Sequence, residues 1–214
     1  MIRILTWLAL LAWLLPAAAV ADDAPAQGKL LVATDVVDGE LFAATVILVL
    51  FYDDSGAFGL VINRPTDVEP DEVFDEDELI AGYHGTLFWG GPVQMDSLRV
   101  LLNTDDPPEG AEKIVDSVYL VSYEDAAAAG PADPAAMRLY IGYAGWAAGQ
   151  LDFELARGSW RVVPGSRDIV FAEDPSGVWK RLSPAQEQRA AVWPNAAPSS
   201  TPSSPADRAV AAVP

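Results

Sequence analysis

Residues 142–155 of this 214-residue chain read GYAGWAAGQLDFEL. The glycines and the tryptophan predict that a strand ends here and that the backbone turns tightly around the large ring of Trp146. A short helix should then begin, because Leu151 and Leu155 are spaced to share one helical face, and Gly158 is placed to end it. The segment therefore predicts a strand, a turn and a helix in direct succession.

Strand patterns dominate on both sides of this unit. Apolar, β-branched and aromatic runs predict strands, and polar or alanine-rich runs near glycine and proline predict short helices. The predicted strands cover residues 28–34, 45–52, 57–63, 87–89, 98–102, 117–123, 137–143, 160–164 and 168–171, and the predicted helices cover residues 68–79, 124–129, 148–157 and 183–191. Many strands with scattered short helices indicate an α+β fold with a mainly antiparallel sheet.

The first 21 residues have the pattern of a cleavable secretory signal peptide. Arg3 is followed by an apolar run over residues 4–15, and Ala19-Val20-Ala21 provides an A-x-A cleavage site. A membrane anchor is the alternative, but the run before Pro16 is shorter than the ~20 apolar residues that span a bilayer. We therefore expect cleavage, and no stable membrane anchor in the mature protein.

The rest of the chain divides by composition. We expect a short linker over residues 22–27, a folded domain over residues 28–182, and a disordered Pro/Ala/Ser-rich tail over residues 183–214. The chain has no cysteine, so it forms neither a disulfide nor an acylated lipoprotein. The absence of cysteine and the predicted signal peptide are both consistent with secretion. In a bacterium, we expect the destination to be the periplasm.

The chain is strongly acidic, with 31 Asp and Glu against 13 Lys and Arg and a formal net charge of −18. Nucleic-acid binding needs clustered Lys and Arg to displace counterions, and the sequence has no such cluster. The same negative charge disfavours binding to an anionic membrane surface. We expect the acidic residues to confer solubility, and we expect no nucleic-acid partner.

Several segments resemble the YqgE/AlgH family, also called DUF179 or UPF0301. They are residues 28–34, 56–65, 90–93 and 142–155, and a fifth segment that runs from Ser159-Trp160 to Val178-Trp179. The resemblance implies a compact α+β domain with a partly barrel-like antiparallel sheet. Some members are called transcriptional regulators, and typical members look cytoplasmic. This chain departs from the family pattern at Asp35, where a proline is usual, and at Phe51-Tyr52-Asp53 and near Leu102, where histidines are common.

Two motifs at predicted strand ends are candidate binding elements. Arg64 could clamp a carboxylate or phosphate with Asn63 orienting it, or both side chains could serve the local backbone and a nearby acid. Gly90-Gly91 could expose backbone N–H groups to an anion, or could form a sharp turn against which Trp89 packs. In both motifs the structural interpretation is favoured.

The helix after Trp146 offers a third candidate. Gln150 and Glu154 lie four residues apart and share a helical face, so they could line a pocket beside Trp146 or hydrogen-bond to loops. His84 is the only histidine and lacks a recognisable catalytic partner. The acidic run over residues 69–78 predicts a solvated helix face rather than a Ca²⁺ site. We therefore expect no catalytic residue, no metal and no cofactor.

The sequence favours a non-enzymatic binding or interaction module whose partner is a small molecule or a protein. Its expected surface combines Gly turns with a few polar groups, the ingredients of a small preformed pocket, at Asn63, Arg64, Gly90, Gly91, Trp146 and Gln150. A hydrolase that uses carboxylates or a bound metal is an alternative, because acids are abundant. A transcriptional regulator is a third possibility, which would require a cytoplasmic location and a basic face.

Overall fold

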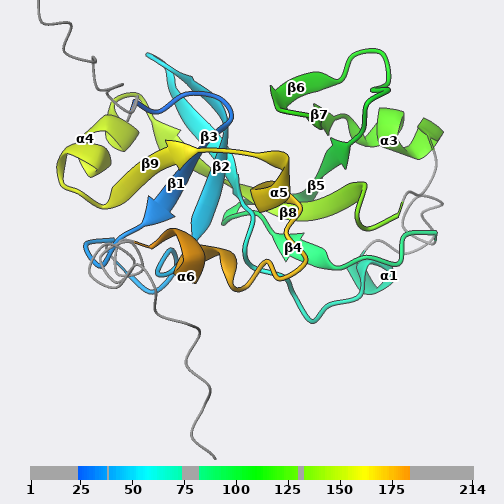
Figure 1. The fold of residues 1–214 in the computed structure, drawn as a ribbon, viewed down its shortest axis with the longest axis horizontal. Coiled ribbons are helices and arrows are strands. Elements are labelled where there is room, and N and C mark those ends of the chain that lie inside the picture. Colours follow the sequence, from blue (N-terminus) through cyan, green and yellow to red (C-terminus); the bar gives the residue numbers. More distant parts are fainter. Residues whose placement is uncertain (1–23, 38, 74–81, 130–132, 184–214) are drawn as a thin grey trace, which may run out of the picture.

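The computed structural model describes residues 24–37, 39–73, 82–129 and 133–183 (Figure 1). The predicted signal peptide, almost all of the predicted tail, the second half of the predicted helix 68–79 and residues 184–191 of the predicted helix 183–191 lie outside the described residues. Within the described part, no helix combines the length and the hydrophobicity needed to cross a bilayer.

The described strands form one curled, mainly antiparallel sheet, which confirms the predicted α+β fold with a partly barrel-like sheet. Its nine strands are ordered β6-β7-β5-β8-β3-β2-β1-β9, with β4 paired to β8 outside this path. The bounds are β1 Lys29–Ala33, β2 Val46–Asp53, β3 Gly56–Val61, β4 Leu87–Trp89, β5 Val93–Asn103, β6 Glu112–Val115, β7 Val118–Val121, β8 Met137–Ala147 and β9 Trp160–Pro164. Only the pairing of β4 with β8 is parallel among these strands.

The hydrophobic core lies on both faces of the central strands. In β1, Leu30 and Val32 join one buried cluster, and Leu31 and Ala33 join the other. A strand buried on both faces reads as a continuous apolar run instead of an alternating one. This explains why the apolar runs around β1 and β2 predicted their strands correctly. The β2–β3 hairpin also turns at the predicted Asp53–Gly56 segment, where Asp53 Oδ1 accepts the Ser55 N–H at 2.7 Å.

Strand β8 joins the two halves of the sheet. Its first part, residues 139–141, pairs with β4 on one edge and with β5 on the other, and its last part pairs with β3. The short link from β4 to β5 must therefore pass across the backbone of β8. It does so at Gly90-Gly91, where a Cβ on Gly91 would lie 2.1 Å from the carbonyl carbon of Tyr143. A Cβ on Gly142, on the strand being crossed, would lie 2.3 Å from the Gly91 carbonyl oxygen. The crossing therefore requires glycine on both segments, at residue 91 of the link and at residue 142 of β8.

The described helices are short and lie at the two ends and one side of the sheet. Their bounds are α1 Pro70–Val73, α3 Tyr123–Ala129, α4 Gln150–Ala156, α5 Arg167–Val170 and α6 Val178–Leu182. Helix α4 lies at the opposite end of the molecule from α1 and α3 (Figure 1). The predicted helices at 124–129 and 148–157 correspond to α3 and α4, whereas α6 had no sequence prediction.

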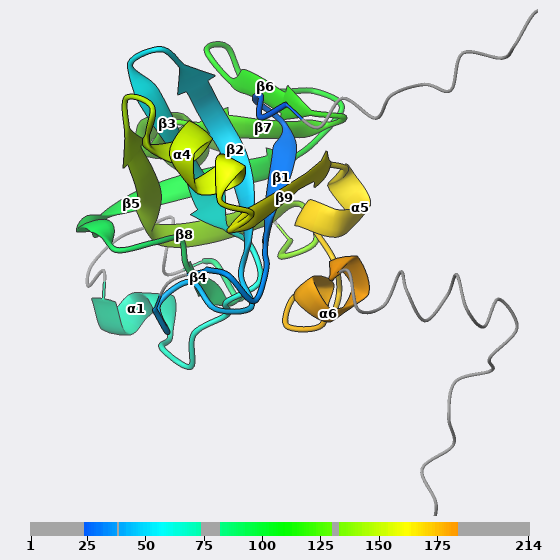
Figure 2. The same cartoon turned by 90° about the vertical axis from the view of Figure 1, so that its left-hand side faces the viewer.

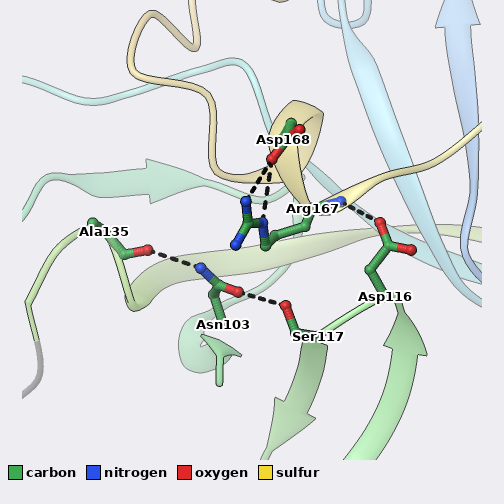
Figure 3. Close-up of polar contacts among 6 residues, drawn as sticks. All are labelled: Asn103, Asp116, Ser117, Ala135, Arg167 and Asp168. Atoms are coloured by element: carbon green, nitrogen blue, oxygen red, sulfur yellow. Dashed lines mark hydrogen bonds and ion pairs between the residues drawn. The ribbon is translucent and has the colours of Figure 1, made fainter. Parts of the chain in front are cut away.

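The prediction of a strand over residues 168–171 is wrong, because this segment forms helix α5. A short apolar run is ambiguous between a strand and a buried helical turn. Here Asp116, in the β6–β7 turn, accepts the backbone N–H of Arg167 at 2.9 Å and so satisfies a free donor at the start of α5 (Figure 3). Arg167 pairs with the neighbouring Asp168 at 3.0 Å, and both side chains are exposed. Val170 is buried in the core.

A buried arginine fixes the end of α5 to the sheet. Arg138, on β8, is only 7 % exposed. Its Nη1 donates to the Val170 carbonyl at 2.7 Å, and its Nη2 donates to the Ala172 carbonyl at 2.5 Å. The guanidinium also lies 4.8 Å from the ring centroid of Phe88 and 5.3 Å from that of Phe171. Charge-assisted hydrogen bonds and cation–π contacts thus hold the segment after β9 against β8.

Candidate functional site

A pocket of about 340 Å³ lies between the end of β8, helix α4 and the start of β9. Helix α4 packs beside β3, β8 and β9 at this end of the sheet (Figure 2). The volume falls within the ~300–1,000 Å³ of small-molecule sites. We call this the indole pocket, and its main lining residues are Phe42, Trp146, Gln150, Phe153, Glu154 and Trp160.

The carboxylate of Glu154 is fixed by three neutral donors. The indole N–H of Trp146 donates to Glu154 Oε2 at 2.9 Å, and the indole N–H of Trp160 donates to the same oxygen at 2.7 Å. The side-chain amide of Gln150 donates to Oε1 at 2.9 Å. No Lys or Arg of the described residues forms an ion pair with Glu154. The pocket therefore contains a rigidly held, half-buried carboxylate without a cationic partner.

The local sequence explains how these side chains converge. Gly149 adopts a left-handed φ of 71°, which lets the chain reverse from β8 directly into α4. Gln150 and Glu154 then lie one helical turn apart, and Gln150 Oε1 accepts the Ala147 N–H at 3.2 Å. The prediction of a turn around Trp146 is wrong in detail. Strand β8 continues through Trp146 because this residue pairs with Ala57 of β3, so the turn comes after it.

Aromatic rings extend from the pocket toward β4. Trp146 and Trp160 are nearly perpendicular, with ring centroids 6.1 Å apart and an interplanar angle of 83°. Phe42, from the loop between β1 and β2, lies 6.0 Å from Trp160 and also 6.0 Å from Trp89. The guanidinium of Arg64 lies 5.1 Å from the centroid of Trp89. This row of aromatic rings connects two parts of the predicted binding surface, one at Trp146 and the other at Arg64.

Asn63 and Arg64 hold the loop that carries Phe42. Arg64 Nη1 donates to the Leu41 carbonyl at 2.5 Å, and its Nη2 donates to the Ala43 carbonyl at 3.0 Å, so the two bonds bracket Phe42. Burial lowers the pKa of Arg64. Asn63 is buried and donates to the Ala44 carbonyl at 2.9 Å, while its Oδ1 accepts the Val46 N–H at 2.7 Å. Both side chains thus serve the backbone of this loop and position a wall of the indole pocket.

Gly90 and Gly91 form the crossing described above. The N–H of Gly90 donates to the Ile141 carbonyl at 2.8 Å, so this group already has a partner within the sheet. The arrangement supports a turn and close backbone approach at this motif. Of the six predicted surface residues, the structure therefore places Trp146 and Gln150 in the pocket, Asn63 and Arg64 behind one of its walls, and Gly90 and Gly91 in the link that crosses β8.

Sequence reasoning missed three parts of the pocket wall. Phe42, Phe153 and Trp160 were not assigned to any site, although Trp160 falls in a correctly predicted strand. The one signal that the sequence offered is an aromatic residue, Phe153, between two acids in the predicted helix, and the structure leaves this side chain 62 % exposed. The positions of Phe42 and Trp160 depend on how distant strands pair.

A second cavity of about 660 Å³ shares Gly145 and Trp146 with the indole pocket. It is more open, and Phe51, Phe58 and Tyr143 form its aromatic wall. Arg99 lies 5.6 Å from the centroid of Tyr143 and donates to Gln94 Oε1 at 3.0 Å. No acid lines this cavity among the described residues.

Among its described residues, the indole pocket lacks the carboxylate pair or metal cluster that the hydrolase alternative requires. No group of three or more His, Asp or Glu side chains within the described ranges is arranged to hold a metal ion. Glu154 is the only acid lining the indole pocket in the part of the chain that the structure describes. The paired carboxylates that the hydrolase alternative requires are therefore not found in this pocket.

Comparison with known proteins gives a consistent picture. The sequence profile of the AlgH-like family, DUF179, matches residues 30–190. A UPF0301 protein of Streptomyces avermitilis is 33 % identical over 171 residues, which cover 77 % of this chain and 89 % of that protein. A UPF0301 protein of Streptomyces coelicolor is 34 % identical over 161 residues, which cover 72 % of this chain and 83 % of the relative.

Two solved structures share the fold. A crystal structure of a Corynebacterium diphtheriae protein aligns with a TM-score of 0.63 and 27 % identity, covering 73 % of this chain and 85 % of that chain. The solution structure of the AlgH protein of Pseudomonas aeruginosa aligns with a TM-score of 0.58 and 26 % identity, covering 83 % of this chain and 98 % of that chain. These matches confirm the resemblance seen in the sequence motifs: the chain belongs to the AlgH-like family, DUF179.

Proposed function

We propose that this protein is a non-enzymatic module that binds a small organic molecule in the indole pocket. The observation that supports this most strongly is the rigid hydrogen-bonded arrangement of Glu154 with Trp146, Trp160 and Gln150 at the wall of a cavity of ligand size. Side chains that are already fixed lose little conformational freedom when a ligand arrives, which favours binding. The names of the matched relatives assign no activity, so the proposal depends on this pocket.

Three probes of similar size test for binding: tetramethylammonium, acetate and tert-butanol, titrated while tryptophan fluorescence is recorded. We expect a saturable change with at least one probe. Phe153→Ala should weaken that binding by at least about threefold, because an aromatic wall is lost. The substitution should barely affect folding, since this side chain is 62 % exposed.

Phe51→Ala is the matched control. Phe51 is also an exposed phenylalanine, at 39 %, but it lines only the larger cavity among those described. Its removal should leave binding unchanged. If none of the three probes gives a saturable signal at tens of millimolar, or if Phe51→Ala weakens binding as much as Phe153→Ala, the indole pocket is not the ligand site.

We also propose that the protein acts outside the cytoplasm. Arg3, the apolar run over residues 4–15 and the A-x-A site at residues 19–21 support this location. The acidic composition favours an exported binding protein over a gene regulator, because DNA repels such a surface. Fractionation with mass spectrometry should find a chain that starts at Asp22 in the periplasmic extract. An intact chain starting at Met1 in the cytosol would contradict export.

A further inference from the structure

We propose that the indole pocket selects an organic cation with an apolar body, such as a quaternary ammonium compound. This inference rests on the proposed function and adds the chemical class of the ligand. It follows from two properties of the pocket: the charge of Glu154, and the orientation of the aromatic rings around it.

In the described structure no Lys or Arg forms an ion pair with Glu154. Its three partners, Trp146, Trp160 and Gln150, are neutral donors that hold the carboxylate without cancelling its charge. A carboxylate accepts about four hydrogen bonds, so three donors leave it available mainly as a source of negative potential. A half-buried negative charge in a cavity favours a positively charged ligand.

The rings provide the second half of the recognition. Trp160 is nearly perpendicular to Trp146, at 83°, and Phe42 meets Trp160 at 73°. The walls thus meet at steep angles, and Phe153 adds an exposed ring on α4. Aromatic faces attract cations through their quadrupole, and several rings around one site are the arrangement that proteins use to bind quaternary ammonium groups. Such a cation needs no hydrogen-bond acceptor, which suits a carboxylate whose oxygens are already occupied.

One basic residue opposes this selection. Arg157 lines the pocket, but it is exposed and its guanidinium lies 5.6 Å from the centroid of Phe153. Solvent screens an exposed charge more strongly than a half-buried one. The attraction of Glu154 should therefore dominate, and Arg157→Gln should strengthen cation binding by about twofold to fivefold.

Isothermal titration calorimetry with choline and 3,3-dimethylbutan-1-ol separates charge from shape, since these two molecules differ mainly in the positive charge. The wild-type protein should bind choline at least about tenfold more tightly than the neutral alcohol. Glu154→Gln should remove this preference, because glutamine keeps the size and the acceptor oxygen but loses the charge. Asp152→Asn is the matched control, since it removes a charge from the same helix outside the pocket lining, where Asp152 accepts the Tyr52 hydroxyl at 2.6 Å.

The possible outcomes separate the two proposals. Equal binding of choline and the neutral alcohol would overturn the selection for a cation while leaving the pocket as a ligand site. Tighter binding of acetate than of choline would overturn it in the same way. Loss of the choline preference in Asp152→Asn as well would show that general surface charge, and not Glu154, attracts the cation. No heat of binding with any probe would overturn both proposals.

Discussion

Gly91→Ala is expected to prevent this protein from folding stably. The added Cβ would lie 2.1 Å from the carbonyl carbon of Tyr143 and 2.3 Å from the Ala144 nitrogen and the Tyr143 oxygen, all of which are backbone atoms. Gly91 also has a φ of 150°, which side-chain-bearing residues rarely adopt. The crossing of β8 cannot relax without breaking strand pairing. We therefore expect the free energy of unfolding to fall by about 4 kcal/mol or more. Urea denaturation followed by circular dichroism measures it.

Gly149→Ala is the control for this substitution. Gly149 also has a positive φ, at 71°, but a Cβ there meets nothing within 4 Å. The variant should therefore lose only the ~1–2 kcal/mol of a strained left-handed conformation. If Gly91→Ala and Gly149→Ala destabilised the protein equally, the close approach of the two backbones at β8 would not be what restricts residue 91 to glycine.

Arg138→Met is expected to destabilise the protein by about 3 kcal/mol and to release the segment over residues 165–183. The variant keeps an apolar stem of similar length, but the carbonyls of Val170 and Ala172 lose their buried donors. Removing a buried charge offsets part of this cost, which is why the expected loss is less than the sum of two charged hydrogen bonds. Hydrogen exchange in residues 165–183 should be faster in the variant than in the wild type, while exchange in β1 and β2 should change much less.

Arg167→Met provides the matched control, because it also replaces an arginine with methionine. Arg167 pairs with Asp168 at 3.0 Å, but the side chains are 51 % and 82 % exposed. Exposed ion pairs contribute little, so the expected change is below about 0.5 kcal/mol. Unchanged exchange in residues 165–183 of Arg138→Met would show that apolar packing alone holds this segment.

Local patterns predicted most of the sheet, and the exceptions have physical causes. The β2–β3 hairpin was predictable because two apolar runs flank a turn rich in Asp, Ser and Gly. Strand β6, Glu112–Val115, was missed because it is short and begins with exposed charged residues, as sheet edges often do. Helix α5 was predicted as a strand because its helical start depends on Asp116, a residue distant in sequence.

The site was predictable where it is local in sequence. Trp146, Gln150 and Glu154 lie on one strand end and one helix, so their spacing made a shared pocket one of two interpretations, beside hydrogen bonds to loops. Phe42 and Trp160 reach the pocket because β9 pairs with β1, a long-range pairing that no local pattern reveals. Arg64 was a candidate ligand clamp for which a structural role was favoured, and its partners here are the carbonyls of Leu41 and Ala43, which no residue type marks in a sequence.

The indole ¹H–¹⁵N signals of the tryptophans test the central claim most directly. The N–H groups of Trp146 and Trp160 both donate to Glu154, whereas that of Trp179 donates to the Ala33 carbonyl at 2.8 Å, outside the pocket. Titration with choline should shift the signals of Trp146 and Trp160 together, along one saturable curve, and leave the signal of Trp179 in place. If choline leaves both pocket signals unmoved, or shifts Trp179 equally, the indole pocket does not bind organic cations.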